Sequence, residues 1–470
     1  MSYPVAETEQ TGRTAIQQPT ARHFLRTAEL AWPIATARTL IVIVFVMDTV
    51  MTGWSGAEQL AYLGLGMAPQ ITLMLVAIGA LQAVPVLTAQ AVGAGAPERA
   101  GDVLRTGFVL SILLGALFLA AAYLSEHFYV AVGQDPVLSR QAAYVNQAFA
   151  WGMIGMLLFV AVNTFLEAIG HPRVGLYVLI GLNILNIPLN GVLALGWWVP
   201  GDGYGAVGAT AGSSLLRWLS LLVCLMVLVQ LSRRNNDCYR VIATSKEWVT
   251  AFRDIVRPEN RRMLRIGLPM GLAQGVESAA FAAIVFLAGL VGSTALAAHQ
   301  ITMNTVSLVF MVAVGIASAT AIRVGNAFGR QSRPDVIRAG WTGIGLSTAF
   351  PVLVTISFLA IPAAIAGIYT DDSATVAVSV ETLRIAALVL ILDAAMAVAL
   401  GALRGLGDVW IPLGLQISAF WLIGVPTAWY FGLHLEMGAP GLMIGIAVGV
   451  TLSFFALALR WAQASRRMTL

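Results

Sequence analysis

Residues 385–403 read IAALVLILDAAMAVALGAL, an apolar run of 19 residues whose only charged side chain is Asp393. A helix of about 20 predominantly apolar residues crosses the hydrocarbon core of a bilayer, so this run predicts a transmembrane span. Two other apolar runs carry one acid each: LIVIVFVMDTVMTGW (40–54) contains Asp48, and IGLPMGLAQGVESAAFAAIVF (266–286) contains Glu277. A carboxylate at membrane depth costs about 2.5 to 3.5 kcal/mol on insertion scales, so the three acids indicate an ion or substrate path.

The composition indicates that most of the chain lies in the membrane. Of 470 residues, 58% are hydrophobic and only 11% are charged. The formal charge of +4 does not indicate a nucleic-acid partner, because the basic residues lie in short loops between apolar runs. The two cysteines, Cys224 and Cys238, have neither CxxC spacing nor a His partner, so we expect no disulfide and no metal site from them.

We therefore expect an all-α integral membrane protein with twelve transmembrane helices. A search for runs of about 20 apolar residues gives the spans, which are 28–52, 61–91, 103–125, 142–168, 173–198, 206–231, 264–290, 294–322, 338–366, 378–403, 409–431 and 438–461. The first 27 residues are polar and contain no removable signal peptide, so we expect them to remain as a tail.

The distribution of Lys and Arg orients these spans. With both termini on the cytoplasmic side, only Arg140 and Arg384 lie outside, while Arg38 and Arg217 fall within spans. All other Lys and Arg residues then lie in cytoplasmic tails and loops, as the positive-inside rule requires. The sequence thus predicts a multi-pass protein with both termini in the cytoplasm.

The chain also repeats itself at an offset of about 236 residues, which is a signal of internal duplication. Pro33, Gly56 and Leu60 recur as Pro269, Gly292 and Leu296. Each unit holds six spans, so the two lobes have the same orientation and are related by a pseudo-two-fold axis along the membrane normal. The predicted parts are a cytoplasmic tail (1–27), an N-terminal lobe (28–231), a basic cytoplasmic linker (232–263), a C-terminal lobe (264–461) and a second cytoplasmic tail (462–470).

Known motifs for enzymes and ATP hydrolysis are missing from the sequence. A P-loop needs a GK[ST] triplet, and the only lysine, Lys246, lies between Ser and Glu. There is no HExxH, GxSxG or CxxC motif, and the five histidines are scattered without ligand spacing. We expect neither an enzyme nor a cofactor, so uphill transport would draw on an ion gradient.

Five motifs together resemble the multidrug and toxic compound extrusion (MATE) transporters. They are LRGLGD (403–408), MDTVMTGW (47–54), AQAVGAG (89–95), LPMGLAQGVES (268–278) and NIPLN (186–190). The chain is most similar to the bacterial drug/cation antiporter branch, whose acids in spans 1, 7 and 10 coincide with Asp48, Glu277 and Asp393. The resemblance implies a secondary active multidrug efflux transporter of the bacterial inner membrane, exporting organic, mostly cationic, compounds in exchange for H+ or Na+.

Residues around the second acid suggest how a cation is held. Gln274 and Phe281 lie three residues before and four residues after Glu277, so all three share one helix face. An aromatic ring beside a carboxylate suits an organic cation. We therefore predict that Glu277 and Asp393 bind the coupling cation, with Gln274 and Phe281 as candidate substrate contacts. Ordinary helix packing is the alternative for Phe281.

Asparagines in span 5 form a second candidate site. Asn183, Asn186 and Asn190 lie on one helix face, and Asn183 is a candidate substrate contact. The resemblance implies a Na+ site made by Asp48, an Asn and an acid four residues apart in span 5, and a hydroxyl in span 6. Asp48 and Asn186 match this pattern, Asn190 replaces the acid, and Ser213 or Thr210 would supply the hydroxyl. The lost charge weakens the case for Na+ there, and helix-to-helix hydrogen bonding is the alternative role for the asparagines.

Several alternatives remain at this stage. The coupling ion is H+ or Na+, bound at Glu277 and Asp393 or at the Asp48 site. A major facilitator carrier also has twelve spans, but its loop after span 2 usually carries a GxxxDRxGRR-like motif, which the VGAGAPERAGDVLR loop lacks. A lipid-precursor flippase of the same superfamily would be favoured by a cationic cavity, and a membrane scaffold would not need buried acids. We expect a monomer surrounded by membrane lipid.

Overall fold

The computed structural model describes residues 20–198, 203–242 and 258–468, and these residues are helical apart from short connections. The first half contains α1 (Thr20–Trp54), α2 (Ala57–Leu81), α3 (Ala83–Gly93), α4 (Arg99–Ala131), α5 (Pro136–Ala168), α6 (Pro172–Leu193) and α7 (Gly205–Arg234). The second half contains α9 (Pro258–Val291), α10 (Ser293–Gly329), α11 (Arg333–Ala360), α12 (Pro362–Gly367), α13 (Ser373–Leu406), α14 (Trp410–Ile417), η2 (Ser418–Gly424), α15 (Val425–Trp429), η3 (Tyr430–His434) and α16 (Gly438–Arg466). Within these described ranges, twelve stretches are long and apolar enough to cross a membrane, which confirms the predicted span number.

Most predicted spans correspond to one helix, and three are divided. The second span consists of α2 and α3, which meet at Gln82, the ninth covers parts of α11 and α12, which are separated by Ile361, and the eleventh runs through α14, η2, α15 and η3. The ends of the predicted linker are helical, because α7 continues to Arg234 and α9 already begins at Pro258. Residues 243–257 of that linker, 1–19 of the first tail and 469–470 of the second lie outside the described residues.

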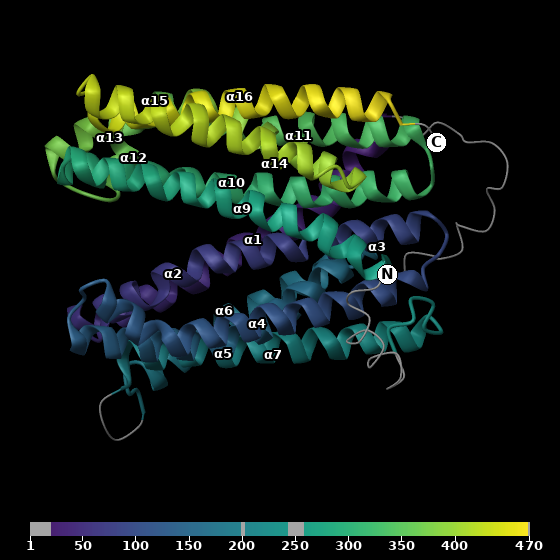
Figure 1. The fold of residues 1–470 in the computed structure, drawn as a ribbon, viewed down its shortest axis with the longest axis horizontal. Coiled ribbons are helices and arrows are strands. Elements are labelled where there is room, and N and C mark those ends of the chain that lie inside the picture. Colours follow the sequence, from purple (N-terminus) through teal and green to yellow (C-terminus); the bar gives the residue numbers. More distant parts are fainter. Residues whose placement is uncertain (1–19, 199–202, 243–257, 469–470) are drawn as a thin grey trace.

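Equivalent helices of the two halves pack in the same way. Figure 1 shows α4 to α7 of the first half in one layer and α10 to α16 of the second half in the other. In the first half α5 contacts α4 and α7, and in the second half α13 contacts α11 and α16. The repeated glycines Gly56 and Gly292 both precede the second helix of their half, with φ of 123° and 142°, a backbone conformation that only glycine adopts without strain. The predicted division into two six-helix lobes is confirmed.

The two lobes meet through reciprocal helix pairs. Helix α1 of the N-terminal lobe packs on α10, and α2 packs on α9. The contacts involve small residues: a Cβ built on Gly93 would lie 2.2 Å from the Asn326 carbonyl oxygen, and one on Gly79 would lie 2.9 Å from Cα of Gly271. These close approaches all lie toward the end of the molecule where α7 ends and α9 begins, which we call the basic end.

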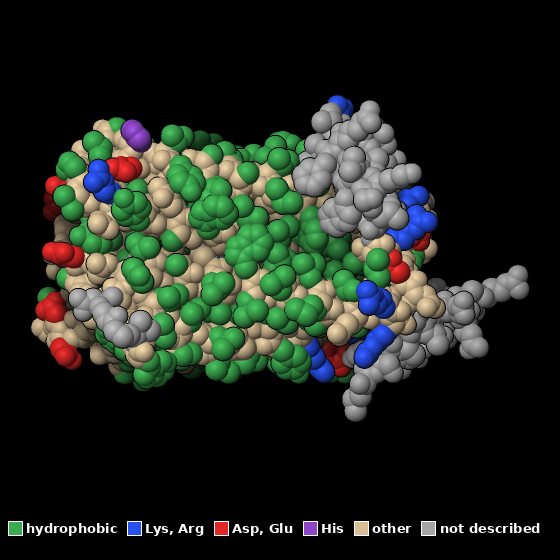
Figure 2. Space-filling view, turned by 90° about the horizontal axis from the view of Figure 1, so that it is seen from below, with side chains coloured by type: hydrophobic (Ala, Val, Ile, Leu, Met, Phe, Trp, Pro, Cys, Tyr) green, Lys and Arg blue, Asp and Glu red, His purple; other side chains and the backbone are tan. Residues whose placement is uncertain are grey.

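Side chains on the surface are distributed as a membrane protein requires. In Figure 2 hydrophobic side chains cover the middle of the face in view, and charged side chains gather at its two ends. Arg233, Arg234, Arg261 and Arg262 lie at the basic end, where helices α7 and α9 meet the linker. The apolar middle matches the hydrocarbon layer of a bilayer.

Candidate functional site

The N-terminal lobe holds a buried polar cluster around Asp48. Asp48 lies on α1 and is only 5% exposed. Its Oδ1 accepts hydrogen bonds from Nδ2 of Asn190 at 2.7 Å and from Nδ2 of Asn186 at 3.1 Å. Its Oδ2 accepts from the Ser213 hydroxyl at 2.5 Å. Helices α1, α6 and α7 therefore converge on one carboxylate through three donors.

The structure separates the candidate residues of this lobe into two groups. Ser213 rather than Thr210 supplies the hydroxyl, because the Thr210 hydroxyl donates to the Ala206 carbonyl one turn back on its own helix. Asn183 does not reach Asp48; its Nδ2 donates to the carbonyl oxygens of Leu40 and Leu179 instead. The three asparagines predicted on one helix face thus make different contacts. Asn186 and Asn190 bond to Asp48, whereas Asn183 joins α6 to α1.

Arg217 on α7 is one of the two arginines predicted to lie within spans, and the sequence indicated no partner for it. Its guanidinium lies over the Phe149 ring, 4.4 Å from the centroid, and 5.7 Å from the Phe45 centroid. It also interacts electrostatically with Asp48. Stacking on two rings lets the charge stay within the span, because a guanidinium is attracted to aromatic faces.

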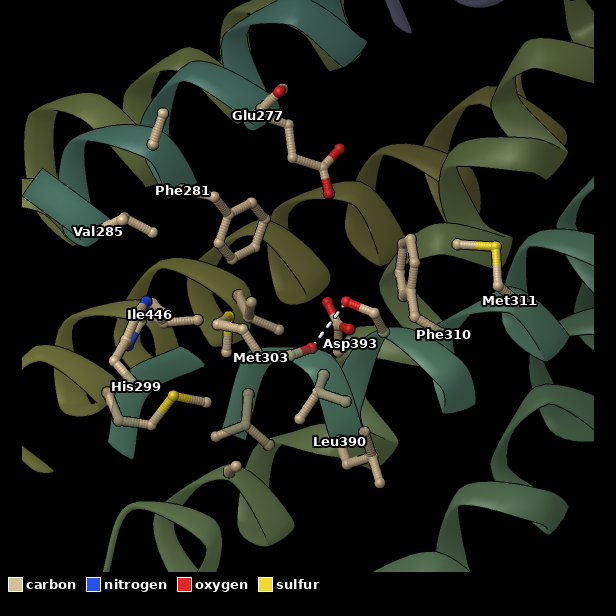
Figure 3. Close-up of a pocket in the computed structure, with 18 of the residues that line it drawn as sticks. Glu277, Phe281, Val285, His299, Met303, Phe310, Met311, Leu390, Asp393 and Ile446 are labelled. Carbon is tan, nitrogen blue, oxygen red and sulfur yellow. Dashed lines mark hydrogen bonds between the residues drawn. The ribbon is translucent and has the colours of Figure 1, made fainter. Parts of the chain in front are cut away.

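The C-terminal lobe contains a cavity of about 370 Å³ onto which both remaining acids open. Glu277 from α9 and Asp393 from α13 line it, together with the predicted contacts Gln274 and Phe281. Figure 3 shows Glu277 and Phe281 projecting from one side and Asp393 and Phe310 from the other. The other lining residues are largely apolar, namely Leu75, Ser278, Ala282, Val285, His299, Met303, Val306, Ser307, Met311, Ala386, Val389, Leu390, Met443, Ile446 and Val450.

Charge and aromatic groups surround this cavity. Glu277 and Asp393 repel each other electrostatically, and Arg404 near the end of α13 attracts Glu277 without lining the cavity. The Phe281 ring packs on Phe420 of η2, with centroids 6.1 Å apart. Asp48 does not line this cavity, and Leu75 of α2 is the one lining residue from the N-terminal lobe among those described. The candidate residues therefore form two separate sites, one in each lobe.

A further buried charge escaped the sequence analysis. Glu167 near the end of α5 is 2% exposed, and its carboxylate lies 3.6 Å from Nη2 of Arg38 on α1. Nδ2 of Asn163, one turn earlier, donates to Glu167 at 2.7 Å. The stretch AVNTFLEAIG contained the signal, because Glu167 lies inside predicted span 4 (142–168), near its end. The predicted in-span Arg38 thus has an acidic partner.

Two polar links between helices were also missed. Gln70 of α2, Asn146 of α5 and Tyr129 of α4 form a buried chain, with bonds of 2.5 and 3.0 Å. Gln90 of α3 bridges the lobes: its amide donates to the Gly405 carbonyl at 2.8 Å and accepts from Arg262 at 2.8 Å. Neither link has a local sequence pattern, because the partners are distant in the chain.

Similarity to known proteins agrees with this architecture. The MatE family model matches residues 33–192 and 269–430, one segment in each lobe. The multidrug resistance protein NorM of Burkholderia vietnamiensis is 34% identical, over 93% of this chain and 94% of the relative. The probable multidrug resistance protein NorM of Rhodopseudomonas palustris is 31% identical, over 94% and 92% respectively.

Solved structures show the same fold at low sequence identity. A eukaryotic MATE transporter, AtDTX14, superposes with a TM-score of 0.81 at 20% identity, covering 95% of this chain and 98% of that one. A mutant of the Vibrio cholerae MATE transporter VcmN gives a TM-score of 0.84 at 16% identity, covering 96% and 98%. The major facilitator alternative is therefore wrong. With two lobes matched by the family model and relatives above 30% identity along nearly the whole chain, this protein belongs to the MATE family of multidrug transporters, which are carriers and not enzymes.

Proposed function

We propose that this protein is a secondary active efflux transporter that exports organic, mostly cationic, compounds in exchange for H+ or Na+. It would act in the bacterial inner membrane with both termini in the cytoplasm, as a monomer surrounded by lipid. One observation carries the proposal: Glu277 and Asp393 share a single apolar cavity of about 370 Å³. Ligand pockets of about 300 to 1,000 Å³ take drug-sized molecules.

The lining of the cavity favours a positively charged substrate. Two carboxylates face it, and no Lys or Arg is among the described residues that line it. The rings of Phe281 and Phe310 offer aromatic faces on which a flat cation can stack. A cation that neutralises one or both acids while covering these rings would be held by charge and by apolar contact.

The same two acids supply the coupling. Two carboxylates in an apolar space repel each other, so a proton, a Na+ ion or an organic cation is needed to stabilise the pair. Binding of one of these cations disfavours the next, and a ligand shifts a conformational equilibrium only through its different affinity for the two states. Exchange follows if the outward-facing state prefers the small ion and the inward-facing state prefers the drug.

The Asp48 cluster is the second candidate for the coupling ion. The amides of Asn186 and Asn190 turn their NH2 groups toward the carboxylate. A half-turn of each amide would present oxygen instead, giving a hard cation two carboxylate oxygens, two amide oxygens and the Ser213 hydroxyl. A proton on Asp48 would need no such rearrangement, because the carboxyl group could then donate to Ser213. The cluster can therefore accept either ion in principle, and the gradient experiment below decides between them.

The experiment is dye uptake into inverted vesicles, which reports efflux because their cytoplasmic face is outside, with pH and sodium gradients imposed separately. Glu277→Gln and Asp393→Asn should each abolish gradient-driven efflux, because each removes one negative charge from the cavity. Ser278→Ala, a change at a neutral lining residue, is the control and should retain efflux. Wild-type rates in both acidic variants would refute the assigned roles, and efflux that follows only one gradient identifies the coupling ion.

A lipid-precursor flippase is the alternative in the same superfamily. Its phosphate-bearing substrate would require basic groups in the cavity, whereas the described lining offers two acids and no Lys or Arg. The sign of this charge favours the efflux proposal. Susceptibility to cationic drugs in a host lacking its own pumps separates the two, because a flippase would not change drug tolerance.

A further inference from the structure

His299 on α10 is the one imidazole among the described residues that line the cavity with Glu277 and Asp393. Its side chain is fully buried, at 0% exposure. Neither of its ring nitrogens has a hydrogen-bond partner within the described part of the chain. Figure 3 shows the ring beside Ile446 at the left of the cavity, with the Phe281 ring between it and Glu277 in this view and with Asp393 across the cavity from it.

An unpaired imidazole in this position is costly. A neutral imidazole has one N–H donor and one acceptor nitrogen, and burial without partners forfeits the bonds that both would make in water. Charging the ring would not help, because an isolated charge is more expensive to bury than a neutral polar group. The neighbouring lining residues Val285, Met303 and Ile446 are apolar and offer no side-chain hydrogen-bond partner.

A partner can reach His299 from the cavity. The terminal torsion of a histidine side chain is broad, so the ring can turn about its Cβ–Cγ bond and direct a nitrogen inward. An occupant held by Glu277 and Asp393 through its positive charge would extend toward this ring, because His299 lines the same cavity. A hydroxyl, carbonyl or amide on the occupant would then satisfy the imidazole.

We propose that His299 is a specificity-determining residue that hydrogen-bonds the uncharged polar group of the transported molecule. The preferred substrates are then amphipathic cations with a neutral hydroxyl, carbonyl or amide at the end away from their positive charge. This inference rests on the proposed function, because it takes the two acids as the site of the cationic end. It adds a discrimination between cations that charge and apolar contact alone do not provide.

The test uses two probes that differ by one hydroxymethyl group. They are tetraphenylphosphonium, which has no hydrogen-bonding group, and [4-(hydroxymethyl)phenyl]triphenylphosphonium. Uptake of each into inverted vesicles is measured at several concentrations for wild type, His299→Gln and His299→Leu. The exposed His434 of η3, changed to Leu, is the matched control.

The wild type should show a KM about 3- to 10-fold lower for the alcohol, as one neutral hydrogen bond provides. His299→Leu should remove this preference by raising the KM for the alcohol, while tetraphenylphosphonium uptake continues and shows that the variant folds. His299→Gln, which keeps a donor and an acceptor, should retain part of the preference. His434→Leu should behave as wild type.

Several results would overturn the inference. An unchanged preference in His299→Leu would remove His299 from substrate recognition while leaving the efflux proposal intact. Equal losses of kcat for both probes in His299→Gln and His299→Leu, with a displaced pH profile, would assign the ring to proton transfer instead. If the wild type takes up neither probe, both this inference and the proposed export of organic cations fail.

Discussion

Replacing Gln90 with Leu should open the basic end of the transporter. Gln90 on α3 is 6% exposed and joins both ends of its amide to the opposite lobe, at Gly405 and at Arg262. Leucine has a similar size but can make neither bond. The closed arrangement would then leave the Gly405 carbonyl without its partner, whereas the separated lobes would expose it to water.

The size of the effect follows from the two bonds. A neutral hydrogen bond contributes about 0.5 to 1.5 kcal/mol, and one with a charged donor about 1.5 to 3 kcal/mol. Arg262 is exposed, so water can replace much of its hydrogen bond to Gln90. The free energy contributed by that bond is therefore smaller than the value for a buried charged donor. We expect a net change of about 1 to 2 kcal/mol, which shifts the closed-to-open ratio by about 5- to 30-fold.

Distances between two spin labels measure this shift. The labels would be placed at exposed positions Glu98 and Arg333, one in each lobe at the basic end, in a background in which the free Cys224 and Cys238 are replaced by Ser. Gln90→Leu should broaden the distance distribution and add a longer component.

A glycine change and a glutamine control complete the design. Gly93→Ala should also lengthen the distance, because its Cβ would lie 2.2 Å from the Asn326 carbonyl oxygen. Gln416→Leu is the matched control, since Gln416 is fully buried within α14 and its amide has no hydrogen-bond partner among the described residues. Unchanged distances in both Gln90→Leu and Gly93→Ala would refute the idea that these contacts close the basic end.

Three further predictions concern individual side chains. Ser213→Ala should reduce efflux by about 10-fold, because Asp48 loses a charge-assisted hydrogen bond, while Thr210→Val should leave efflux rates unchanged since that hydroxyl bonds its own helix. Glu167→Gln should lower the free energy of unfolding by about 3 kcal/mol because Arg38 is left unpaired in the span, and thermal melting in nanodiscs should show partial recovery when Arg38→Met is added; no recovery would mean that the pair is not coupled. Hydrogen bonds from Thr375 lower the pKa of Asp372 at the start of α13 below its ordinary value of 3.8, so its stabilising contribution is present at neutral pH and is lost as the pH falls through the lowered value. The protection factors of the amides in the first turn of α13, which correct for the pH dependence of intrinsic hydrogen exchange, should therefore fall in acid in the wild type and be insensitive to pH in Asp372→Ala.

The sequence was sufficient to predict the fold because crossing a membrane restricts the length and composition of each helix. Apolar runs of span length, separated by basic loops, identify helices without any knowledge of packing. The repeat then identified the two lobes. It is visible at Gly56 and Gly292 because the turn before the second helix of each half has a positive φ and so requires glycine in both halves. The breaks at Gln82 and in η2 were not predictable, since they depend on how neighbouring helices pack.

The candidate sites were predictable to the extent that their residues contrast with their surroundings. Asp48, Glu277 and Asp393 stand out because a charge in an apolar run is expensive wherever the helix is placed. Asn183 and Asn190 looked equivalent on one helix face, and only the position of α1 separates the one that bonds Asp48 from the one that does not.

The roles of Gln90, Gly93 and His299 could not be found in this way. Gln90 and Gly93 lie in the AQAVGAG motif, but polar and small residues are common and the motif does not show what they contact. Their importance lies in the partner across the lobe interface, or in the lack of one inside a cavity. Sequence therefore indicates candidate sites for ions and cations, whereas the contacts proposed to close the basic end, and the one proposed to choose between substrates, depend on distances that exist only in the folded protein.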